Sequence, residues 1–243
     1  MIYYFSGTGN SEWAAKTLAE KTKDEAQFIN KDTVLKNDSV IGIVFPIYAW
    51  GVPGPVEDFL KTIDIPSDAY VYALATCGSN CGVVDNQIEK IIGRKLNAIL
   101  SLSLPNNYIQ GGDCDEEATI KKKFGKAIPK LNEFAEIVNG RKDGIFVERG
   151  PLPHVMTNIV HIAFLKLATS DKKFSVNDDC VLCGSCESNC PLHNITLKDG
   201  KPTWNGNCSQ CTSCINRCPK HAIQYGNSKP SRVRYYFKEE YLK

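Results

Sequence analysis

The sequence lacks a hydrophobic run long enough to cross a lipid bilayer. The longest apolar stretch extends from Val155 to Ala168, and His161 and Lys166 interrupt it. A membrane-spanning helix needs about 20 consecutive apolar residues. The first residues contain neither a basic segment nor a small-residue cleavage site. Because we find no export signal and no membrane span, we expect a soluble, cytoplasmic protein.

Several common catalytic and nucleotide-binding motifs are also missing. The sequence has no Gly-x-x-x-x-Gly-Lys loop and no Gly-x-Gly-x-x-Gly fingerprint. This argues against a nucleoside triphosphatase and against a dinucleotide-binding enzyme. No Ser-His-Asp set and no pair of catalytic carboxylates can be recognised either. The sequence therefore predicts no catalytic residue.

Cysteine, in contrast, is abundant and arranged in a repeat. Eight of the eleven cysteines form two copies of the pattern Cys-x2-Cys-x2-Cys-x3-Cys-Pro, and the copies are offset by 28 residues. The first copy comprises Cys180, Cys183, Cys186 and Cys190, and the second comprises Cys208, Cys211, Cys214 and Cys218. His193 and His221 also recur at this offset. The repeat indicates an internal duplication.

This spacing is typical of ligands to iron-sulfur clusters. A four-iron cluster needs four thiolates, and three cysteines at this spacing wrap one face of it. In a tandem arrangement, the fourth cysteine of each copy completes the cluster of the other copy. The sequence thus predicts one cluster on Cys180, Cys183, Cys186 and Cys218 and a second on Cys190, Cys208, Cys211 and Cys214.

Zinc sites and disulfide bonds are the alternative uses of such cysteines. Structural zinc sites use two Cys-x2-Cys pairs separated by a longer loop, not a triple followed by a fourth cysteine and a proline. Disulfide bonds require an oxidising compartment. Residues 174–224 resemble the bacterial two-cluster ferredoxins, with all eight ligand positions present.

The N-terminal segment predicts a phosphate-binding loop between a strand and a helix. The apolar run from Ile2 to Phe5 predicts the strand, and residues 12–19 have helical periodicity. Between them lie Ser6, Gly7, Thr8, Gly9, Asn10 and Ser11. The glycines let backbone amides converge on an anion, and the positive end of the helix favours a phosphate. A plain glycine-rich turn is the alternative. The loop resembles the phosphate loop of flavodoxins, which implies FMN as the cofactor.

The remainder of residues 1–148 alternates between strand and helix patterns. Further strands are predicted over residues 26–30, 40–45, 70–75 and 98–104. Helices are predicted over residues 55–63, 83–96 and 116–139, the last bent or broken near Pro129. Such alternation is typical of a parallel sheet with helices on both faces. The predicted fold class is α/β, a flavodoxin-like doubly wound parallel sheet of five strands in the order 2-1-3-4-5, with its cofactor beyond the carboxyl ends of strands one and three.

The loops after the third and fourth predicted strands suit a flat flavin ring. The first loop contributes Pro46, Tyr48, Ala49, Trp50 and Gly51, and the second contributes Thr76, Cys77, Gly78, Ser79 and Asn80. Aromatic side chains can flank the ring, while small polar residues can bond its edge. The long loop after the fifth strand, residues 105–112 with Tyr108, could fold over the ring, and a surface excursion is its alternative. Ordinary packing and simple turns are the alternatives. Cys77, Cys81 and Cys114 are expected to be buried small residues.

Four segments follow from these patterns. Residues 1–148 form a flavodoxin-like FMN-binding domain, residues 149–172 a linker and interdomain helix, residues 173–225 a small α+β ferredoxin domain, and residues 226–243 a tail. The helix, predicted over residues 154–169, is apolar over much of its surface and is expected to pack between the domains. The tail mixes basic and aromatic residues, as a nucleic-acid surface would, but Glu239 and Glu240 favour a tail docked on the fold.

The charge of the chain argues against a nucleic-acid partner. The formal net charge is +2 when all cysteines count as neutral thiols. An oxidised four-iron cluster with its four thiolates carries about −2, so two clusters bring the chain to about −2.

Over nearly its whole length, the chain resembles the flavodoxin-ferredoxin fusion proteins of anaerobes. Clusters pass single electrons, whereas a flavin accepts two. The resemblance therefore implies an electron-transfer flavoprotein with FMN, two 4Fe-4S clusters, and redox proteins as donor and acceptor. A flavin-dependent reductase of a small-molecule acceptor, such as a quinone or a nitro compound, is the first alternative. A redox sensor or structural module without flavin is the second.

Overall fold

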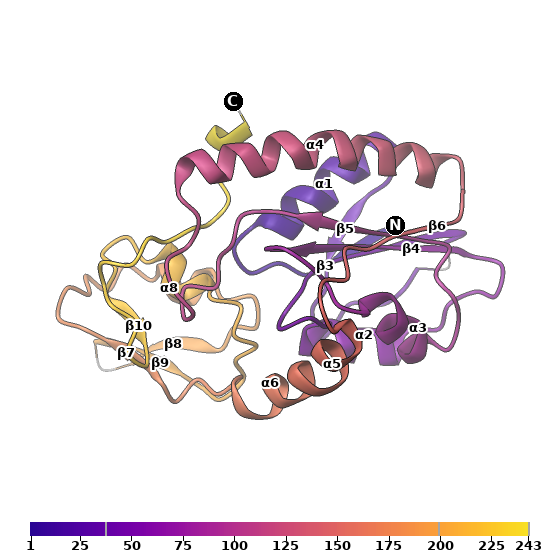
Figure 1. The fold of residues 1–243 in the computed structure, drawn as a ribbon. Helices are drawn as coiled ribbons and strands as arrows, with labels where there is room; N and C mark the ends of the chain where they lie inside the picture. The colour runs from indigo at the N-terminus through magenta and orange to yellow at the C-terminus, as the bar shows by residue number, and fades with distance from the viewer. Residues whose placement is uncertain (37, 199, 243) are drawn as a thin grey trace.

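The computed structural model describes residues 1–36, 38–198 and 200–242, and it consists of a large α/β part and a small cysteine-rich part (Figure 1). Within these residues, the large part is built on a six-stranded parallel sheet in the order β2-β1-β3-β4-β5-β6. The strands are β1 (Ile2–Tyr4), β2 (Ala26–Phe28), β3 (Val40–Pro46), β4 (Tyr70–Cys77), β5 (Ala98–Ser103) and β6 (Gly144–Phe146). The predicted order of the first five strands is confirmed, and β6 extends the sheet beyond the prediction.

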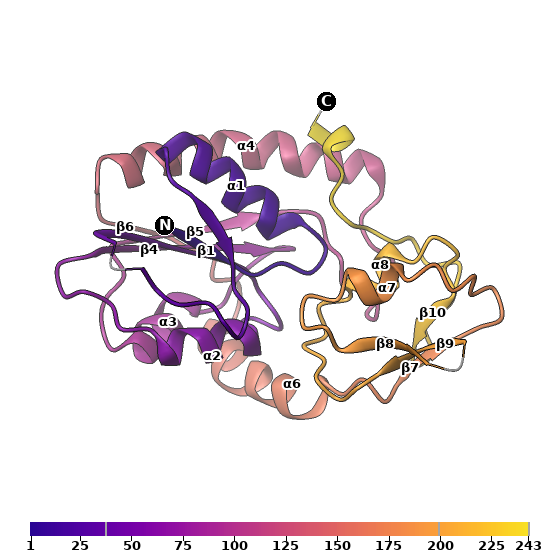
Figure 2. The same cartoon turned by 180° about the vertical axis from the view of Figure 1, so that it is seen from behind.

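Helices cover both faces of the sheet (Figures 1 and 2). One face carries α1 (Asn10–Thr22) and α4 (Glu117–Asn139), and the other carries α2 (Gly54–Thr62) and α3 (Val84–Ile92). Side chains of β4 alternate between the two cores. Tyr72 and Leu74 pack toward α1 and α4, whereas Ala73 and Ala75 pack toward α2 and α3. A strand buried on both sides explains its nearly continuous apolar sequence.

Helix α4 runs through Pro129 without a break, so of the expected bend or break the break does not occur. A proline inside a helix removes one backbone hydrogen bond and crowds the carbonyl four residues earlier. Pro129 is exposed, and the residue four positions before it is the exposed Gly125. The freed carbonyl group therefore faces water, and the buried face of the helix, with Phe124 and Leu131, remains packed on the sheet.

The cysteine-rich part contains two small antiparallel ribbons and two short helices. Strand β7 (Phe174–Val176) pairs with β10 (Ile223–Tyr225), and β8 (Ile195–Lys198) pairs with β9 (Lys201–Trp204). Helix α7 (Ser185–Ser188) belongs to the first cysteine run and α8 (Ser213–Arg217) to the second.

The backbone repeats the duplication seen in the sequence. Left-handed φ angles occur at the non-glycine pairs Leu182 and Gln210 (55° and 61°) and His193 and His221 (49° and 52°). Each pair is separated by the 28-residue offset. Non-glycine residues rarely adopt this conformation, so its recurrence shows that the two halves share one local fold.

A connecting helix, residues 153–167, joins the two parts. It comprises α5 (Pro153–Val155), a π-helical turn η1 (Met156–Val160) and α6 (His161–Leu167). Its inner face contacts the loop after β3, because the Thr157 hydroxyl donates to the Trp50 carbonyl at 2.8 Å. Its outer face remains exposed at Val155, Ile159, Ile162 and Leu167. The connecting helix therefore packs on the α/β part with its inner face and leaves its outer face exposed. Within the described residues, no helix has the length and apolar character needed to cross a membrane.

The C-terminal tail returns to the α/β part, as Figure 1 shows. The Phe237 amide donates to the Thr8 carbonyl at 2.7 Å, and the Tyr235 hydroxyl donates to Asn10 Oδ1 at 2.6 Å. The Phe237 ring packs against Trp13 and Phe124, with centroid distances of 6.1 and 5.7 Å. The chain then ends in the turn η2 (Glu239–Leu242) beside α4. The expectation of a docked tail is confirmed.

Candidate redox site

The loop of residues 6–11 lies between the end of β1 and the start of α1. Gly9 adopts a φ of +101° there, a conformation that favours glycine. Two side chains of the loop are occupied by protein partners, since Ser11 Oγ lies 2.9 Å from Thr76 Oγ1 and Asn10 Nδ2 donates to the Pro105 carbonyl at 2.9 Å. In the described chain, the backbone amides of Thr8, Asn10 and Ser11 have no protein acceptor. Free amides at a helix N-terminus suit an anion such as a phosphate.

A cavity of about 420 Å³ opens beside this loop. The predicted cofactor residues that line it are Ser6, Gly7, Thr8, Asn10, Ser11, Pro46, Tyr48, Ala49, Trp50, Thr76, Cys77, Gly78, Ser79, Asn80 and Tyr108. The three predicted loops thus meet around one space at the carboxyl edge of the sheet.

Two predicted cofactor residues, Gly9 and Gly51, do not line the cavity. They lie against the segments that pack on the cavity loops, Gly9 against the tail and Gly51 against the connecting helix. A Cβ atom on Gly51 would lie 2.4 Å from the ring of His161. A Cβ atom on Gly9 would lie 2.8 Å from the Cβ atom of Phe237. Both glycines therefore allow a close approach of the connecting helix or the tail.

The aromatic loop after β3 makes a tight turn held by the connecting helix. Tyr48 and Gly51 exchange backbone hydrogen bonds of 3.0 and 3.1 Å. Ala49 and Trp50, between them, have φ angles of +44° and +66°, a strained conformation for residues other than glycine. The His161 imidazole supports the turn, because its Nδ1 lies 2.8 Å from the Tyr48 carbonyl. The Trp50 indole N–H donates to Asn80 Oδ1 at 2.7 Å. This hydrogen bond joins the loop after β3 to the loop after β4.

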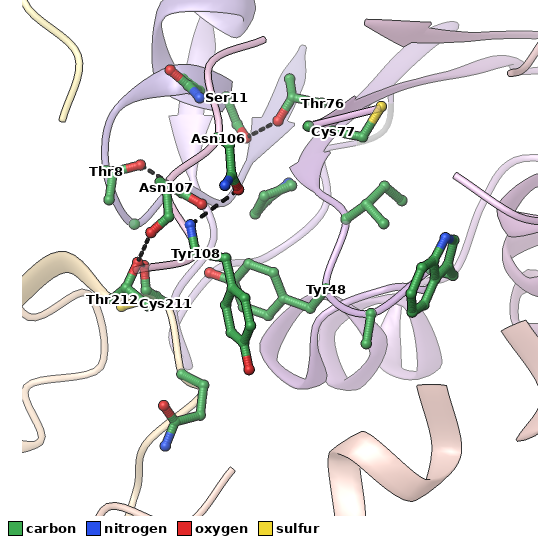
Figure 3. Close-up of a pocket in the computed structure, with 18 of the residues that line it drawn as sticks. Thr8, Ser11, Tyr48, Thr76, Cys77, Asn106, Asn107, Tyr108, Cys211 and Thr212 are labelled. Carbon is green, nitrogen blue, oxygen red and sulfur yellow. Dashed lines mark hydrogen bonds between the residues drawn. The ribbon is translucent and has the colours of Figure 1, made fainter. Parts of the chain in front are cut away.

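Tyr48 and Tyr108 both line the cavity (Figure 3). Tyr108 is 43% exposed and lies at the opening. Its amide donates to Asn106 Oδ1 at 3.1 Å, which orders the loop that carries it. Burial raises the pKa of Tyr48 well above its usual value, and the nearby thiols of Cys211 and Cys208 add to the rise. Tyr48 therefore stays neutral, and it lies close to the second cysteine run.

The eight repeat cysteines enclose two small cavities. The first cavity is lined by Cys180, Cys183, Cys186 and Cys218, here called the distal set. The second is lined by Cys190, Cys208, Cys211 and Cys214, here called the proximal set. Each cavity thus gathers three cysteines of one run and the fourth of the other. No three His, Cys, Asp or Glu side chains in the described ranges converge as a single metal ion would require. Four thiols around a wider space suit a cluster of several irons.

Backbone amides point at the thiols in both sets. The Asn194 amide donates to Cys190 Sγ, and the Ala222 amide, 28 residues later, donates to Cys218 Sγ, both at 3.3 Å. Burial raises the pKa of Cys208 to about 11 and that of Cys211 to about 12. Such buried thiols become thiolates only beside a positive charge, which metal ions supply. The donor set therefore fits an iron-sulfur cluster.

Cys211 brings the proximal set into contact with the large cavity. It lines both spaces. A Cβ atom on Gly7 would lie 2.7 Å from the Cys211 carbonyl oxygen and 2.8 Å from the Cys211 Cβ atom, so the phosphate loop touches the proximal set directly. Asn107 bridges the same junction, because its Nδ2 donates to Thr8 Oγ1 at 2.5 Å while its carbonyl accepts from Thr212 Oγ1 at 3.1 Å (Figure 3).

The distal set faces solvent instead. Cys183 is exposed, and Val181 and Leu182 beside it are 56% and 47% exposed. The two sets therefore differ in surroundings, since one lies at the surface and the other against the cavity.

The three cysteines outside the repeat lie in the cores. Cys77 and Cys81 pack between the sheet and helices α2 and α3. Although Cys77 borders the cavity, Figure 3 shows its sulfur turned away from Tyr48 and Tyr108. Cys114 donates to Asn216 Oδ1 at 3.6 Å, and burial raises its pKa to about 12. These surroundings are those of structural thiols.

Sequence reasoning missed part of the cavity wall. The additional lining residues are Ile47, Pro105, Asn106, Asn107, Val160, Phe164, Gln210, Cys211 and Thr212. Most of them come from the connecting helix, the loop after β5 and the second cysteine run. The run Pro105-Asn106-Asn107 belongs to the loop after the fifth strand that was predicted to fold over the flavin, although only Tyr108 of that loop was named as a cofactor residue. Nothing local in the sequence indicates the contributions of the connecting helix and the cysteine run.

Comparisons with known proteins support this division of the chain. Residues 179–223 match the 4Fe-4S dicluster domain family. The chain therefore joins a flavodoxin-like α/β domain, defined by its strand order, to a 4Fe-4S dicluster domain. A search of curated proteins gives no match.

Solved structures resemble this chain only with low sequence identity and low TM-scores. A presumptive flavoprotein from Bacteroides uniformis ATCC 8492 is 20% identical, with a TM-score of 0.39, over 42% of this chain and 88% of that one. Rubredoxin:oxygen oxidoreductase from Desulfovibrio gigas is 13% identical, also with a TM-score of 0.39, over 57% of this chain and 34% of that one. Similarities at this level carry no argument about function.

Proposed function

We propose that this protein is an electron-transfer flavoprotein that binds FMN in the large cavity and a 4Fe-4S cluster on each cysteine set. In this proposal, residues 6–11 hold the FMN phosphate, and Tyr48, Trp50 and Tyr108 surround the flavin ring with the loop of residues 76–80. The clusters supply one-electron steps and the flavin a two-electron reservoir.

The observation that carries the proposal is the double position of Cys211. This one residue borders both the candidate flavin cavity and the proximal thiols. A cluster held by Cys211 would therefore adjoin the flavin without an intervening protein layer. The packing of Gly7 against Cys211 supports the same conclusion from the phosphate side.

The different exposure of the two cysteine sets supports an order in which electrons pass between the redox centres. The distal set, with Cys183, Val181 and Leu182 at the surface, is suited to contact a redox protein partner. The proximal set is suited to pass electrons between the distal set and the flavin. We thus infer a linear order of partner, distal cluster, proximal cluster and flavin.

Cofactor content of protein purified without oxygen tests the proposal. We expect about eight irons, from two four-iron clusters, and one FMN per chain. A visible spectrum should show resolved flavin bands above broad cluster absorption. Protein with full iron content that binds no added FMN would contradict the flavin assignment and leave the cluster assignment intact.

A flavin-dependent reductase is the second candidate, favoured by the opening beside Tyr108. This side chain is 43% exposed at the cavity mouth, so a small acceptor could reach the cavity there. Steady-state turnover with quinones and nitro compounds, with electrons supplied by a reduced one-electron carrier protein, tests this activity. Turnover that falls when Tyr108→Trp narrows the opening would support a reductase, whereas reduction of protein acceptors alone would support the electron carrier.

A further inference from the structure

The internal duplication makes it possible to compare the two cysteine sets position by position. Trp204 and Ser209 line the proximal cavity and correspond at the 28-residue offset to Val176 and Val181, of which Val181 lines the distal cavity. One half therefore has an indole N–H and a hydroxyl where the other half has two valines. The proximal half therefore has two side-chain donors of hydrogen bonds that the distal half lacks at these positions.

Trp204 and Ser209 both line the proximal cavity with its four thiols. The Trp204 Nε1 and Ser209 Oγ atoms are buried, and among the described residues neither has a nitrogen or oxygen partner. The indole is held in place by Phe174, whose ring is stacked on it at 4.9 Å with an interplanar angle of 4°. A buried polar donor without a partner is unfavourable, so both groups call for an acceptor inside this cavity.

Sulfur atoms are the acceptors that the cavity can offer. The Trp204 side chain faces Cys214, and the Ser209 side chain faces Cys211. In the distal cavity, the corresponding Val181 is apolar and solvent-exposed, and the lining adds the apolar Leu197, Pro202 and Ile223.

Some other groups near the thiols are equivalent in the two sets, and three are not. The Gln210 backbone amide donates to Cys208 Sγ at 3.3 Å, Thr212 of the proximal lining replaces Gly184, and the exposed Lys220 of the distal lining replaces Leu192.

The amides of Asn194 and Ala222 make equivalent contacts in the two halves. Ser185 recurs as Ser213, so each cavity has one such serine. Arg234 lies near Cys218 of the distal set and Cys214 of the proximal set and acts on both.

Reduction of a cluster adds one electron and therefore one negative charge. Burial disfavours this added charge, and a donor directed at sulfur favours it. The proximal set is the more buried of the two, since Cys211 is half-buried whereas the equivalent Cys183 is exposed. Cys186 and Cys214, the next equivalent pair, are both buried. Without compensation, its cluster would be the harder one to reduce.

We propose that Trp204 and Ser209 donate hydrogen bonds to the sulfurs of the proximal cluster and raise its reduction potential, so that this buried cluster can accept electrons from the distal one. The inference rests on the proposed cluster assignment. It adds that two side chains, absent from the other half of the repeat, raise the potential of the proximal cluster. The exposed Lys220 acts in the same direction on the distal cluster.

Redox titration of the full chain, purified without oxygen and followed by electron paramagnetic resonance, tests this role. Ser209→Ala and Trp204→Phe remove the donors, and the phenylalanine preserves the stacking with Phe174. For each variant we expect up to about a tenfold loss in the equilibrium constant for one-electron reduction of one cluster, equal to about 59 mV. The other cluster should keep its potential.

Val181→Ala is the matched control, because it changes the equivalent position without changing hydrogen-bonding capacity. It should shift neither potential. Val181→Ser should raise the potential of the distal cluster, because it adds the missing donor. Iron content is measured for every variant.

The outcomes separate this inference from the proposed function. Two clusters whose potentials do not move in Ser209→Ala and Trp204→Phe would overturn the inference alone. Equal shifts in both variants and in Val181→Ala would overturn it as well, because the effect would then come from packing. Wild-type protein without cubane signals would instead sink the cluster assignment on which it rests.

Discussion

At the scale of single residues, Gly51 is a position where a contact with a residue distant in sequence, His161, leaves no room for a side chain. Its ideal Cβ atom would lie 2.4 Å from the His161 ring, whereas a Cβ atom on Gly54 would meet nothing within 4 Å. Gly54 can therefore serve as the control for Gly51, because only the Cβ atom at position 51 would meet the His161 ring.

Gly51→Ala should therefore destabilise the protein by about 1–3 kcal/mol, because the added methyl group must displace a buried imidazole. Gly54→Ala should change stability by less than about 1 kcal/mol, because alanine is favoured in a helix while Pro55 after it disfavours the helical backbone. The midpoint of thermal unfolding of both variants checks this. Equal destabilisation by the two substitutions would argue against the contact with His161.

The cysteines allow a test of ligand pairing through double variants. If Cys190 belongs to the set of Cys208, Cys211 and Cys214, then Cys190→Ser combined with Cys211→Ser damages one cluster only. About four irons per chain should remain. Cys190→Ser combined with Cys183→Ser damages both clusters and should leave almost none. The opposite pattern of iron content would mean that each run holds its own cluster.

The sequence predicted residues whose signal is local. The cysteine spacing and the glycine-rich loop each occupy a few consecutive positions, and the structure brings them together as two thiol sets and one cavity edge. Val160 and Phe164 were missed as cavity residues, because an apolar residue in a helix looks the same whether it faces a core or a cofactor.

At the scale of secondary structure, the connecting helix couples the aromatic turn to the rest of the molecule through His161. Its Nδ1 donates to the Tyr48 carbonyl, since a carbonyl can only accept, and its buried Nε2 has no hydrogen-bond partner among the residues that the structure describes. Burial lowers the pKa of His161, while the Tyr48 carbonyl and Glu57 act in the opposite direction. The folded protein therefore favours the neutral imidazole.

This predicts a pH dependence of stability with a definite sign. Below the ordinary histidine pKa of about 6.5, the unfolded chain binds a proton at His161 that the folded protein resists. Stability should therefore fall as the pH is lowered from about 6.5 toward the lower folded-state pKa, and should not depend on His161 above that range.

Thermal unfolding of the wild type, His161→Asn and His154→Asn over a pH series tests this. His154 is exposed and serves as the control. The Asn variant at 161 should lose less stability on acidification than the wild type, whereas the variant at 154 should follow the wild type. Parallel curves for all three proteins would count against a role of His161.

The tail is the second element with a predicted energetic effect. Phe237 packs on Trp13 and Phe124, the first in α1 and the second in α4. Phe237→Ala should destabilise the protein by roughly 2 kcal/mol, less than the 3–5 kcal/mol of a fully buried phenylalanine, because the side chain is only partly buried. Val233→Ala, at a more exposed tail position, should change the unfolding midpoint little. Similar midpoints for both variants would argue against tail docking in solution.

Elements were predictable where periodicity extends over many residues. The alternation of strands and helices in residues 1–139 follows the predicted order. Strand β6 was missed because it has three residues, two of them exposed, and carries no periodic signal. Of the bend or break expected at Pro129, the break did not occur, because the proline lies on the solvent side of α4.

At the scale of the whole molecule, the contact between the two parts could not be read from the sequence. Asn107 forms hydrogen bonds with the loop of residues 6–11 and with the second cysteine run. Its partner Thr8 lies 99 residues before it and its partner Thr212 lies 105 residues after it. No local pattern encodes such a junction. It results from the docking of one folded part on the other, and it gives the arrangement its functional meaning.

The central claim is that electrons entering at the clusters reach the flavin within one chain. Rapid mixing of the oxidised protein with a limiting amount of a reduced one-electron carrier, followed by absorbance at the flavin band, tests it most directly. We predict that flavin reduction follows cluster reduction with a first-order rate that does not change with protein concentration. A rate that rises in proportion to protein concentration, or a flavin that stays oxidised beside reduced clusters, would contradict the account.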